Sequence, residues 1–193
     1  MKVIFLDHDG VICLPKQWGS REKKQRELIN KENITELDKI NIKVDDFDKL
    51  AVDILNEIIK ETECEIVVSS DWKHTLTLEE MGKYYESKGI LKKPINYTEP
   101  FNYKEYIEYR ISQENQGYSH TPEEYRAYEI HRYLEKHPEI THWVVIDDLD
   151  MRYYSWYDKD IIVPWGIKNM ILTIYNEGLK QTGLKDKILK YLT

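Results

Sequence analysis

The feature that most constrains the fold is a short apolar run that ends in polar or acidic residues, and this pattern occurs three times. The three segments are Lys2–Leu6, Cys64–Ser70 and Thr141–Asp147. Runs of this length that are rich in β-branched residues and are followed by turn-forming residues predict buried β-strands. We therefore expect three buried strands that are far apart in the sequence.

Helical periodicity fills several of the segments between these runs. In Phe47–Thr62 the apolar residues recur three or four positions apart, which is the spacing of an amphipathic helix. Strands that alternate with helices predict a parallel α/β sheet with helices on both faces. The predicted helices are 47–62, 75–88, 103–116, 121–136, 167–177 and 184–192, with a loop at 90–103 and a short fourth strand at 160–163.

The length and composition of the chain fit one globular domain. The chain has 193 residues, of which 41% are hydrophobic and 33% are charged, a profile typical of a soluble protein. Residues 14–46 are polar, carry charges of both signs and show weak periodicity, which indicates an insertion with some helix. We expect a single domain over residues 1–193, with small insertions near 14–46 and 74–120.

Membrane and secretory segments are not expected. No apolar run approaches the roughly 18 residues needed to cross a bilayer, and the N-terminal apolar run is broken by Asp7. Cys13 and Cys64 form no metal-type CxxC pair and each lies beside an apolar run, so both are expected to be free thiols in or near the core. We predict a cytoplasmic protein, and the sequence leaves its oligomeric state open.

Charge and aromatic content bear on the partners of the protein. The net charge of −7 argues against nonspecific binding of nucleic acid, which usually requires a basic surface, although a local basic groove is compatible with it. Tyrosine, present 15 times, is expected mainly to fill half-buried helix faces. Aromatic rings can also stack on bases, and the candidates are Trp18, Trp72, Tyr97, Phe101 and Tyr103.

The polar residues that end the predicted strands form the candidate site. Ligands of open α/β sheets bind at the carboxyl ends of the strands. Asp7, Ser69 and the pair Asp147 and Asp148 are therefore expected to converge there. Two neighbouring acids at the end of a buried strand are costly unless a cation or hydrogen bonds compensate for them. This cost favours a metal-binding role for Asp147 and Asp148 over a purely structural one.

Asp7 and Asp9 are two carboxylates on one turn, and Gly10 allows that turn to be tight. One carboxylate can attack phosphorus to form an acyl phosphate. The other can protonate the leaving oxygen and then activate water. Such a cluster of acids repels itself without a cation, and Mg²⁺ fits because it prefers oxygen ligands. A plain Asp–Gly β-turn is the alternative interpretation.

Hydroxyl and basic side chains after the second strand could bind a phosphoryl group. Ser69 can donate a hydrogen bond to a phosphoryl oxygen, although a serine at this place often only caps a turn. Ser70 follows directly and is included as a candidate phosphate ligand. Lys73 could contact phosphate or simply be solvated.

Together these segments resemble the haloacid dehalogenase (HAD) superfamily. Asp7–Val11, Ile66–Ser69 and Val144–Asp148 look like its motifs I, II and IV. The closest resemblance is to the small HAD domains found alone or in RNA-repair proteins. Those domains carry a serine-rich segment that is followed by a tryptophan and a basic residue, which corresponds here to Ser69–Lys73. They also carry a helix that begins with arginine before the two acids, which corresponds here to the helix from Arg126. The resemblance implies a three-layer Rossmann-like fold with a parallel sheet and small cap insertions.

The resemblance also implies roles for the two acids of the first turn and for a basic residue. Asp7 would be the nucleophile and a metal ligand. Asp9 would be the general acid and base, and its backbone carbonyl would bind the metal. Arg126 would neutralise the charge at Asp7, in competition with Lys104, Arg110 and Arg132.

The remaining roles follow the same resemblance. Ser69 would hold the phosphoryl group. Asp148 would be the metal ligand of the acidic pair, and Asp147 would support it. Family members that are ATPases carry threonine in place of Asp9 and dehalogenases lack the acid, so Asp9 favours phosphatase or phosphomutase chemistry. A mutase usually needs a substantial cap, and the insertions here are small, so hydrolysis is the preferred reaction.

The sequence leaves several substrates open. The resemblance to repair-associated domains favours a nucleotidase or a phosphatase of a polynucleotide end, such as a 3′-phosphate. The alternatives are a phosphatase of small metabolites such as sugar phosphates, and a HAD-like binding module without catalysis. The complete set of Asp7, Asp9, Ser69 and Asp148 argues against the binding module.

Overall fold

A parallel sheet forms the centre of the protein. The computed structural model describes residues 1–100, 102, 104, 108, 121–152 and 166–193. Within these residues the sheet has five strands in the order β3-β2-β1-β4-β5, and each neighbouring pair is parallel. The strands are β1 (Lys2–Leu6), β2 (Glu65–Val68), β3 (Asn96–Tyr97), β4 (His142–Asp147) and β5 (Met170–Leu172).

The register of the three central strands brings their carboxyl ends level. Leu6 of β1 pairs with Val68 of β2 and with Ile146 of β4. The next backbone amides continue the ladder, since the N–H of Asp7 donates to the carbonyl of Ile146 at 3.0 Å and the N–H of Ser69 donates to the carbonyl of Leu6 at 2.9 Å. The residue that follows each strand therefore enters the same edge of the sheet, as expected.

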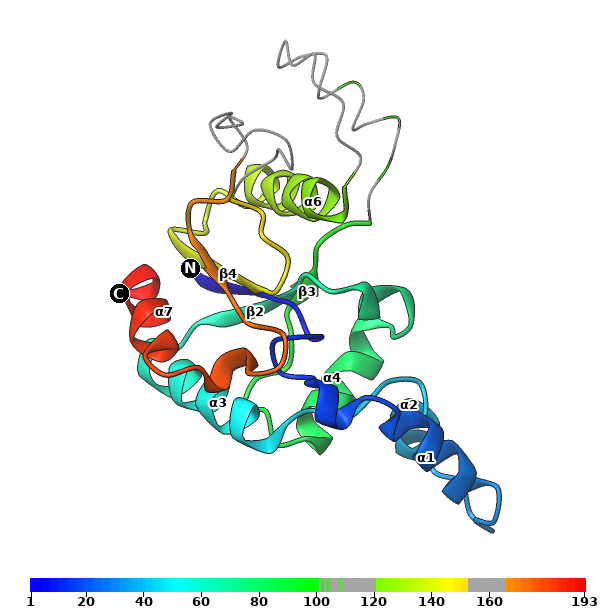
Figure 1. Ribbon diagram of the computed structural model, residues 1–193. Helices are drawn as coiled ribbons and strands as arrows, with labels where there is room; N and C mark the ends of the chain where they lie inside the picture. The colour runs from blue at the N-terminus through cyan, green and yellow to red at the C-terminus, as the bar shows by residue number, and fades with distance from the viewer. Residues whose placement is uncertain (101, 103, 105–107, 109–120, 153–165) are drawn as a thin grey trace.

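Helices cover both faces of the sheet and complete a three-layer α/β fold (Figure 1). On one face Ile4 and Leu6 pack in a core with α3, α4 and α7, whereas on the other face Val3 and Phe5 pack against α6. This alternation follows from the two-residue period of a strand. The helices are α3 (Lys49–Thr62), α4 (Leu78–Ser87), α6 (Pro122–Lys136) and α7 (Leu184–Leu192).

The helix ends agree with the capping signals in the sequence. The Thr121 side chain accepts from the backbone N–H of Glu124, and Pro122 occupies the first turn of α6. Thr77 and Glu80 form a reciprocal capping box at the start of α4. Such caps satisfy backbone N–H groups that have no partner inside the helix.

The insertion near 14–46 is mainly helical. It contains a 3₁₀ turn at Pro15–Gln17, α1 (Ser20–Leu28) and α2 (Glu36–Asn41), and α1 and α2 lie side by side at the lower right of Figure 1. Ion pairs from Asp46 to Lys24 at 3.1 Å and to Lys88 at 2.7 Å join this segment to the end of α4.

The predicted helix at 167–177 is wrong, because Met170–Leu172 forms β5 beside β4. A short apolar run is ambiguous between helix and strand, and here the open edge of β4 supplies backbone partners for a strand. The predicted loop at 90–103 also contains the two-residue strand β3. The predicted strand at 160–163 and nearly all of the predicted helix at 103–116 lie outside the described residues.

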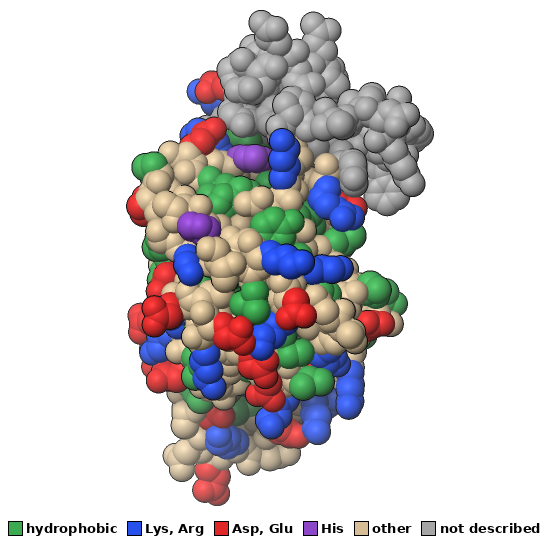
Figure 2. Space-filling view, turned by 90° about the vertical axis from the view of Figure 1, so that its left-hand side faces the viewer, with side chains coloured by type: hydrophobic (Ala, Val, Ile, Leu, Met, Phe, Trp, Pro, Cys, Tyr) green, Lys and Arg blue, Asp and Glu red, His purple; other side chains and the backbone are tan. Residues whose placement is uncertain are grey.

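Cys13 and Cys64 are buried free thiols, as predicted. No helix in the described part of the chain is long and apolar enough to cross a membrane. Acidic and basic side chains are intermixed on the face seen in Figure 2. The described residues of that face therefore form no surface of a single charge sign, such as proteins use to track a long nucleic-acid backbone.

Candidate active site

The turn after β1 positions Asp7 and Asp9. The His8 carbonyl accepts backbone N–H groups of Val11, Ile12 and Cys13, and the N–H of Gly10 donates to the carbonyl of Cys13 at 2.9 Å. These bonds fold the chain sharply back on itself. The carboxylate of Asp7 consequently stays at the end of the strand, in the buried interior.

Gly10 is required by the geometry of this turn. Its φ of +69° is in the left-handed region that favours glycine. A Cβ atom at Gly10 would lie 2.2 Å from Oδ2 of Asp148. The absence of a side chain thus lets the Asp148 carboxylate approach the backbone of the turn that carries Asp7 and Asp9.

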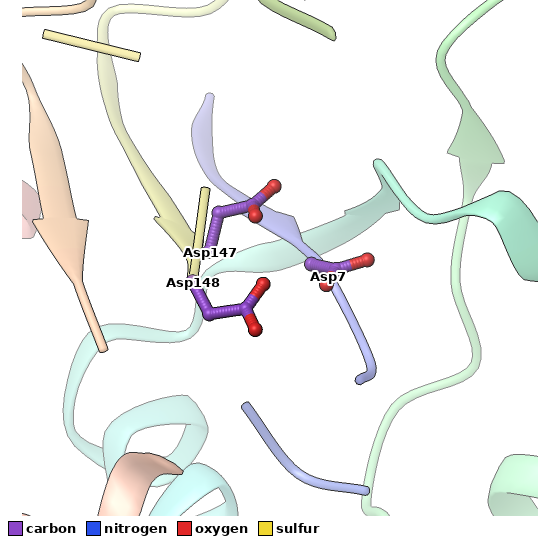
Figure 3. A group of neighbouring side chains, drawn as sticks. All are labelled: Asp7, Asp147 and Asp148. Carbon is purple, nitrogen blue, oxygen red and sulfur yellow. The ribbon is translucent and has the colours of Figure 1, made fainter. Parts of the chain in front are cut away.

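Three carboxylates converge at the ends of β1 and β4. Asp7, Asp147 and Asp148 each place one oxygen so that all three oxygens lie within 4.8 Å of one another. Figure 3 shows Asp7 at the end of β1 and the other two side chains beside it at the end of β4. Asp7 and Asp147 are buried, and Asp148 is half-buried.

Burial and mutual repulsion make it costly for all three acids to be ionised. Burial raises the pKa of Asp7 to about 6. The charges of Asp148 and Asp9 also raise this pKa, whereas the charge of Arg126 lowers it. Burial raises the pKa of Asp147 well above its usual range, and the charge of Asp7 adds to this effect. Partial burial also raises the pKa of Asp148. Such a group of oxygen ligands suits a hard divalent cation, which would relieve the repulsion.

Arg126 supplies a cation to this cluster from α6. Its Nη1 donates to Asp7 Oδ1 at 3.0 Å, to Asp147 Oδ2 at 3.0 Å and to the backbone carbonyl of Ser69 at 2.6 Å, and its Nη2 donates to Asp71 at 3.1 Å. Burial acts to lower the pKa of Arg126, but Asp7 and the other carboxylates outweigh it and raise that pKa. The guanidinium therefore ties the ends of β1, β2 and β4 to one helix.

The other basic candidates lie elsewhere or outside the described residues. Arg132 pairs with Glu135 at 2.7 Å on an exposed part of α6. Lys104 is exposed. Arg110 is outside the described residues. Among the described candidates, Arg126 is the one that the structure brings to Asp7.

The two serines after β2 lie close to the same cluster, since the Ser69 carbonyl accepts from Arg126 and Ser70 affects the pKa of Asp7. Ser69 is fully buried, and its Oγ has no hydrogen-bond partner among the described residues. An unpaired buried hydroxyl costs free energy, so this Oγ is well suited to a ligand oxygen. The Ser70 hydroxyl acts to lower the pKa of Asp7 by hydrogen bonding.

Lys73, a predicted phosphate ligand, has its ammonium group engaged by other residues of the chain. Its ammonium group forms a buried ion pair with Glu129 of α6 and donates to the hydroxyl of Thr98 at 3.1 Å. Thr98 in turn donates to Glu129 at 3.1 Å. Lys73 thus connects the segment after β2 to α6.

Trp72 holds Asp9, a contact that the sequence did not indicate. The indole N–H of Trp72 donates to Oδ2 of Asp9 at 2.9 Å. The Trp72 ring stacks on Phe47 with centroids 5.3 Å apart and also contacts the ring of His8 at 4.6 Å. His8 is buried there, with its Nε2 2.6 Å from the hydroxyl of Tyr85. These rings form a rigid support for the turn.

The predicted base-stacking residues are dispersed. Trp72 is buried in the aromatic cluster just described, so its faces are not open to a base. Trp18 is exposed and stacks on Tyr175 with centroids 6.3 Å apart. Tyr97 is half-buried on β3. Phe101 and Tyr103 lie outside the described residues.

Comparison with known families agrees with this geometry. Residues 3–182 match the family model described as the HAD domain in Swiss Army Knife RNA repair proteins. The chain belongs to this family. Searches among curated proteins and among solved structures found no match. The general activity of a HAD domain is that of a phosphatase-type hydrolase, and Mg²⁺ is its usual cofactor.

Proposed function

We propose that this HAD domain is a magnesium-dependent phosphomonoester hydrolase that acts through a phosphoryl group on Asp7. The observation that carries the proposal is the convergence of Asp7, Asp147 and Asp148 around Arg126 beside the unpaired hydroxyl of Ser69. A buried acidic cluster with one guanidinium and a hydroxyl is suited to a cation and a phosphoryl group together.

Asp7, Asp147 and Asp148 would hold Mg²⁺, with the backbone carbonyl of Asp9 as a further ligand. Asp148 is expected to bind the ion directly and Asp147 to support it, because both oxygens of Asp147 are already hydrogen-bonded. Its Oδ2 accepts from Arg126 at 3.0 Å and its Oδ1 accepts from the backbone N–H of Leu149 at 2.9 Å. When bound, the cation supplies charge neutralisation and polarises a phosphoryl oxygen.

In the first half-reaction a carboxylate oxygen of Asp7 attacks the phosphorus atom. A new O–P bond forms as the ester O–P bond breaks, and the leaving oxygen takes a proton from Asp9. Arg126 and the Ser69 hydroxyl would orient the phosphoryl oxygens and stabilise the charge that develops on them. The products of this step are the free alcohol and an acyl phosphate on Asp7.

In the second half-reaction Asp9, now ionised, takes a proton from water. The water oxygen attacks phosphorus, the bond between Asp7 and phosphorus breaks, and inorganic phosphate leaves. Asp9 is protonated again at the end of the cycle and Asp7 is ionised, so both residues are restored.

The substrate we propose is a nucleotide or the phosphorylated end of a polynucleotide. It is supported by the family description, which places such HAD domains in RNA repair proteins. A sugar phosphate is the second candidate, because the acidic cluster itself does not discriminate among phosphate esters. A binding module without catalysis is disfavoured, since it has no need of a buried acid cluster that is costly to maintain.

The test is phosphate release from p-nitrophenyl phosphate, nucleoside monophosphates and a 3′-phosphorylated oligonucleotide. We expect Mg²⁺-dependent release, and a decrease in kcat of at least about 1000-fold in Asp7→Asn, because the nucleophile is lost. Asp150→Asn is the matched control, since Asp150 pairs with Arg152 at 2.8 Å outside the acidic cluster. Undiminished turnover in Asp7→Asn, or full activity in excess EDTA, would contradict the proposal.

A further inference from the structure

Arg126 uses its two terminal nitrogens in different ways. Nη1 donates to Asp7 and Asp147, each at 3.0 Å, and to the Ser69 carbonyl at 2.6 Å. Three acceptors thus share the N–H groups of this one nitrogen, so Nη1 has no donor left for a ligand. Nη2 donates to Asp71 at 3.1 Å, which is its single partner among the described residues. Of the two terminal nitrogens, Nη2 is therefore the one that can turn to a phosphoryl oxygen.

The carboxylate of Asp71 is held loosely. Its side chain is 82% exposed, whereas that of Arg126 is 9% exposed. The contact with Arg126 is the one hydrogen bond that the described residues give to this side chain. The backbone around it is fixed, because Ser70 and Trp72 on either side are buried. Exposed ion pairs contribute little stability, so the Asp71 side chain can leave Arg126 without a change in the fold.

A carboxylate and a phosphoryl group compete for such a donor. Both present anionic oxygens, which form charge-assisted hydrogen bonds with a guanidinium. The two anions also repel each other, so Nη2 is expected to hold one of them at a time. In the empty site the Asp71 carboxylate thus takes the donor that a phosphoryl oxygen would need.

Building on the proposed phosphatase function, we propose that Asp71 competes with the phosphoryl group for Arg126 and thereby limits the affinity of the site for phosphate. When a phosphate ester binds, the Asp71 side chain turns into solvent and Nη2 donates to a phosphoryl oxygen. After hydrolysis, the return of Asp71 to Nη2 favours the release of inorganic phosphate.

The opposite role for Asp71 would be to hold Arg126 in place for the phosphoryl group. The contacts of Nη1 already hold it, since the side chains of Asp7 and Asp147 are 7% and 0% exposed and neither can turn into solvent. The two roles predict opposite results when the charge of Asp71 is removed. Competition predicts tighter binding of phosphate, whereas positioning predicts weaker binding.

The experiment measures the Kd of inorganic phosphate by calorimetry in the presence of Mg²⁺, and KM for p-nitrophenyl phosphate. We expect Asp71→Asn to lower both values about 3- to 10-fold, because an uncharged amide competes less well for a guanidinium. Asp150→Asn is the matched control, since it removes the same charge from a pair with Arg152 at 2.8 Å. This control should change the Kd less than about 2-fold.

A second background separates competition for Nη2 from simple repulsion between anions. Arg126→Lys keeps a cation but lacks the second terminal nitrogen. If Asp71 acts through Nη2, adding Asp71→Asn to Arg126→Lys should change the Kd of phosphate less than about 2-fold. Thermal unfolding checks that each variant is folded.

Three results would overturn the inference. They are unchanged or weaker phosphate binding in folded Asp71→Asn, an equal gain in affinity in Asp150→Asn, and the full gain in the Arg126→Lys background. Because binding is measured separately from turnover, a different result bears on the phosphatase itself. A wild-type protein that binds phosphate but hydrolyses no phosphate ester would count against the proposed function.

Discussion

At the scale of single residues, the contact between Trp72 and Asp9 determines where a proton can reside. An indole N–H is only a donor, so Oδ2 of Asp9 must act as an acceptor. We therefore expect the proton that Asp9 gives to a leaving group to lie on Oδ1. We infer that Trp72 is a positioning residue for the general acid, acting through Asp9.

Trp72→Phe should slow the hydrolysis of esters with poor leaving groups far more than that of p-nitrophenyl phosphate. The variant retains a ring against Phe47 but loses the N–H donor. Alkyl phosphates need protonation of the leaving oxygen, whereas p-nitrophenolate does not. We expect kcat to fall about 10- to 100-fold for the alkyl ester and less than about 5-fold for the aryl ester.

The control for this prediction is Trp143→Phe, the same substitution in β4 at a residue that packs against Phe5. It should leave the dependence on leaving group unchanged. An equal loss of kcat for alkyl and aryl esters in Trp72→Phe would show that Trp72 supports the fold and does not position Asp9.

At the scale of elements, the ion pair between Lys73 and Glu129 joins the 3₁₀ turn Asp71–His74 to α6. Glu129 lies one turn after Arg126, so this buried pair helps to fix the helix that carries the guanidinium. Lys73→Met should lower the free energy of unfolding by about 3 kcal/mol, because it leaves a buried carboxylate without its cation. Burial lowers the pKa of Lys73, and the charge of Glu129 opposes this effect. The charged form of Lys73 is therefore stabilised by Glu129.

The double variant Lys73→Met/Glu129→Met should regain most of this stability in urea unfolding, since neither charge is then left unpaired. Its KM for phosphate esters should stay within about 3-fold of the wild type if Lys73 is structural. A large increase in KM in the stable double variant would instead support Lys73 as a phosphate ligand.

The three central strands, β1, β2 and β4, were predictable because each leaves a continuous apolar run in the sequence. The convergence of Asp7, Ser69 and Asp147 followed, since parallel strands share one carboxyl edge. β5 was missed because Met170–Leu172 is short and its strand conformation depends on the edge of β4. Local sequence carries no information on that edge.

Side-chain pairings across elements were much less predictable. Arg126 was assigned only through a family resemblance, because nothing near it in the sequence shows that it reaches Asp7. The partners of Lys73 and Asp9 lie 56 and 63 positions away, respectively. Such contacts depend on how α6 and the turn after β2 pack on the sheet, which the spacing of residues does not reveal.

At the scale of the whole molecule, the acidic cluster links stability to pH and to cations. The pKa of Asp7 is raised from its usual value near 3.8 to about 6, so the folded state binds a proton that the unfolded state releases. The resulting stabilisation is complete below pH 3.8 and is lost as the pH rises through 6. It amounts to about 3 kcal/mol for Asp7 alone, and Asp147 and Asp148 act with the same sign.

His8 acts in the opposite direction. Burial lowers the pKa of His8 from 6.5 to about 3, and Arg126 contributes in the same direction. The stabilisation from neutral His8 is therefore present above pH 6.5 and is lost as the pH falls toward 3. A stability curve measured against pH without Mg²⁺ would combine the effects of His8 and of the acidic cluster. The difference in stability between Mg²⁺-bound and Mg²⁺-free protein reports on the acidic cluster alone.

We therefore expect Mg²⁺ to raise the Tm, and this increase to become larger between pH 5 and pH 8. At low pH protons compete with the cation for Asp7, whereas at high pH the ion removes the repulsion among ionised acids. The measurement is thermal unfolding with and without Mg²⁺. At a Mg²⁺ concentration about 100-fold above its Kd, we expect about 2.7 kcal/mol of stabilisation. Asp148→Asn should lose most of the effect, whereas Asp150→Asn should retain it. An increase in Tm that is the same at pH 5 and pH 8, or is unchanged in Asp148→Asn, would place the cation outside the acidic cluster.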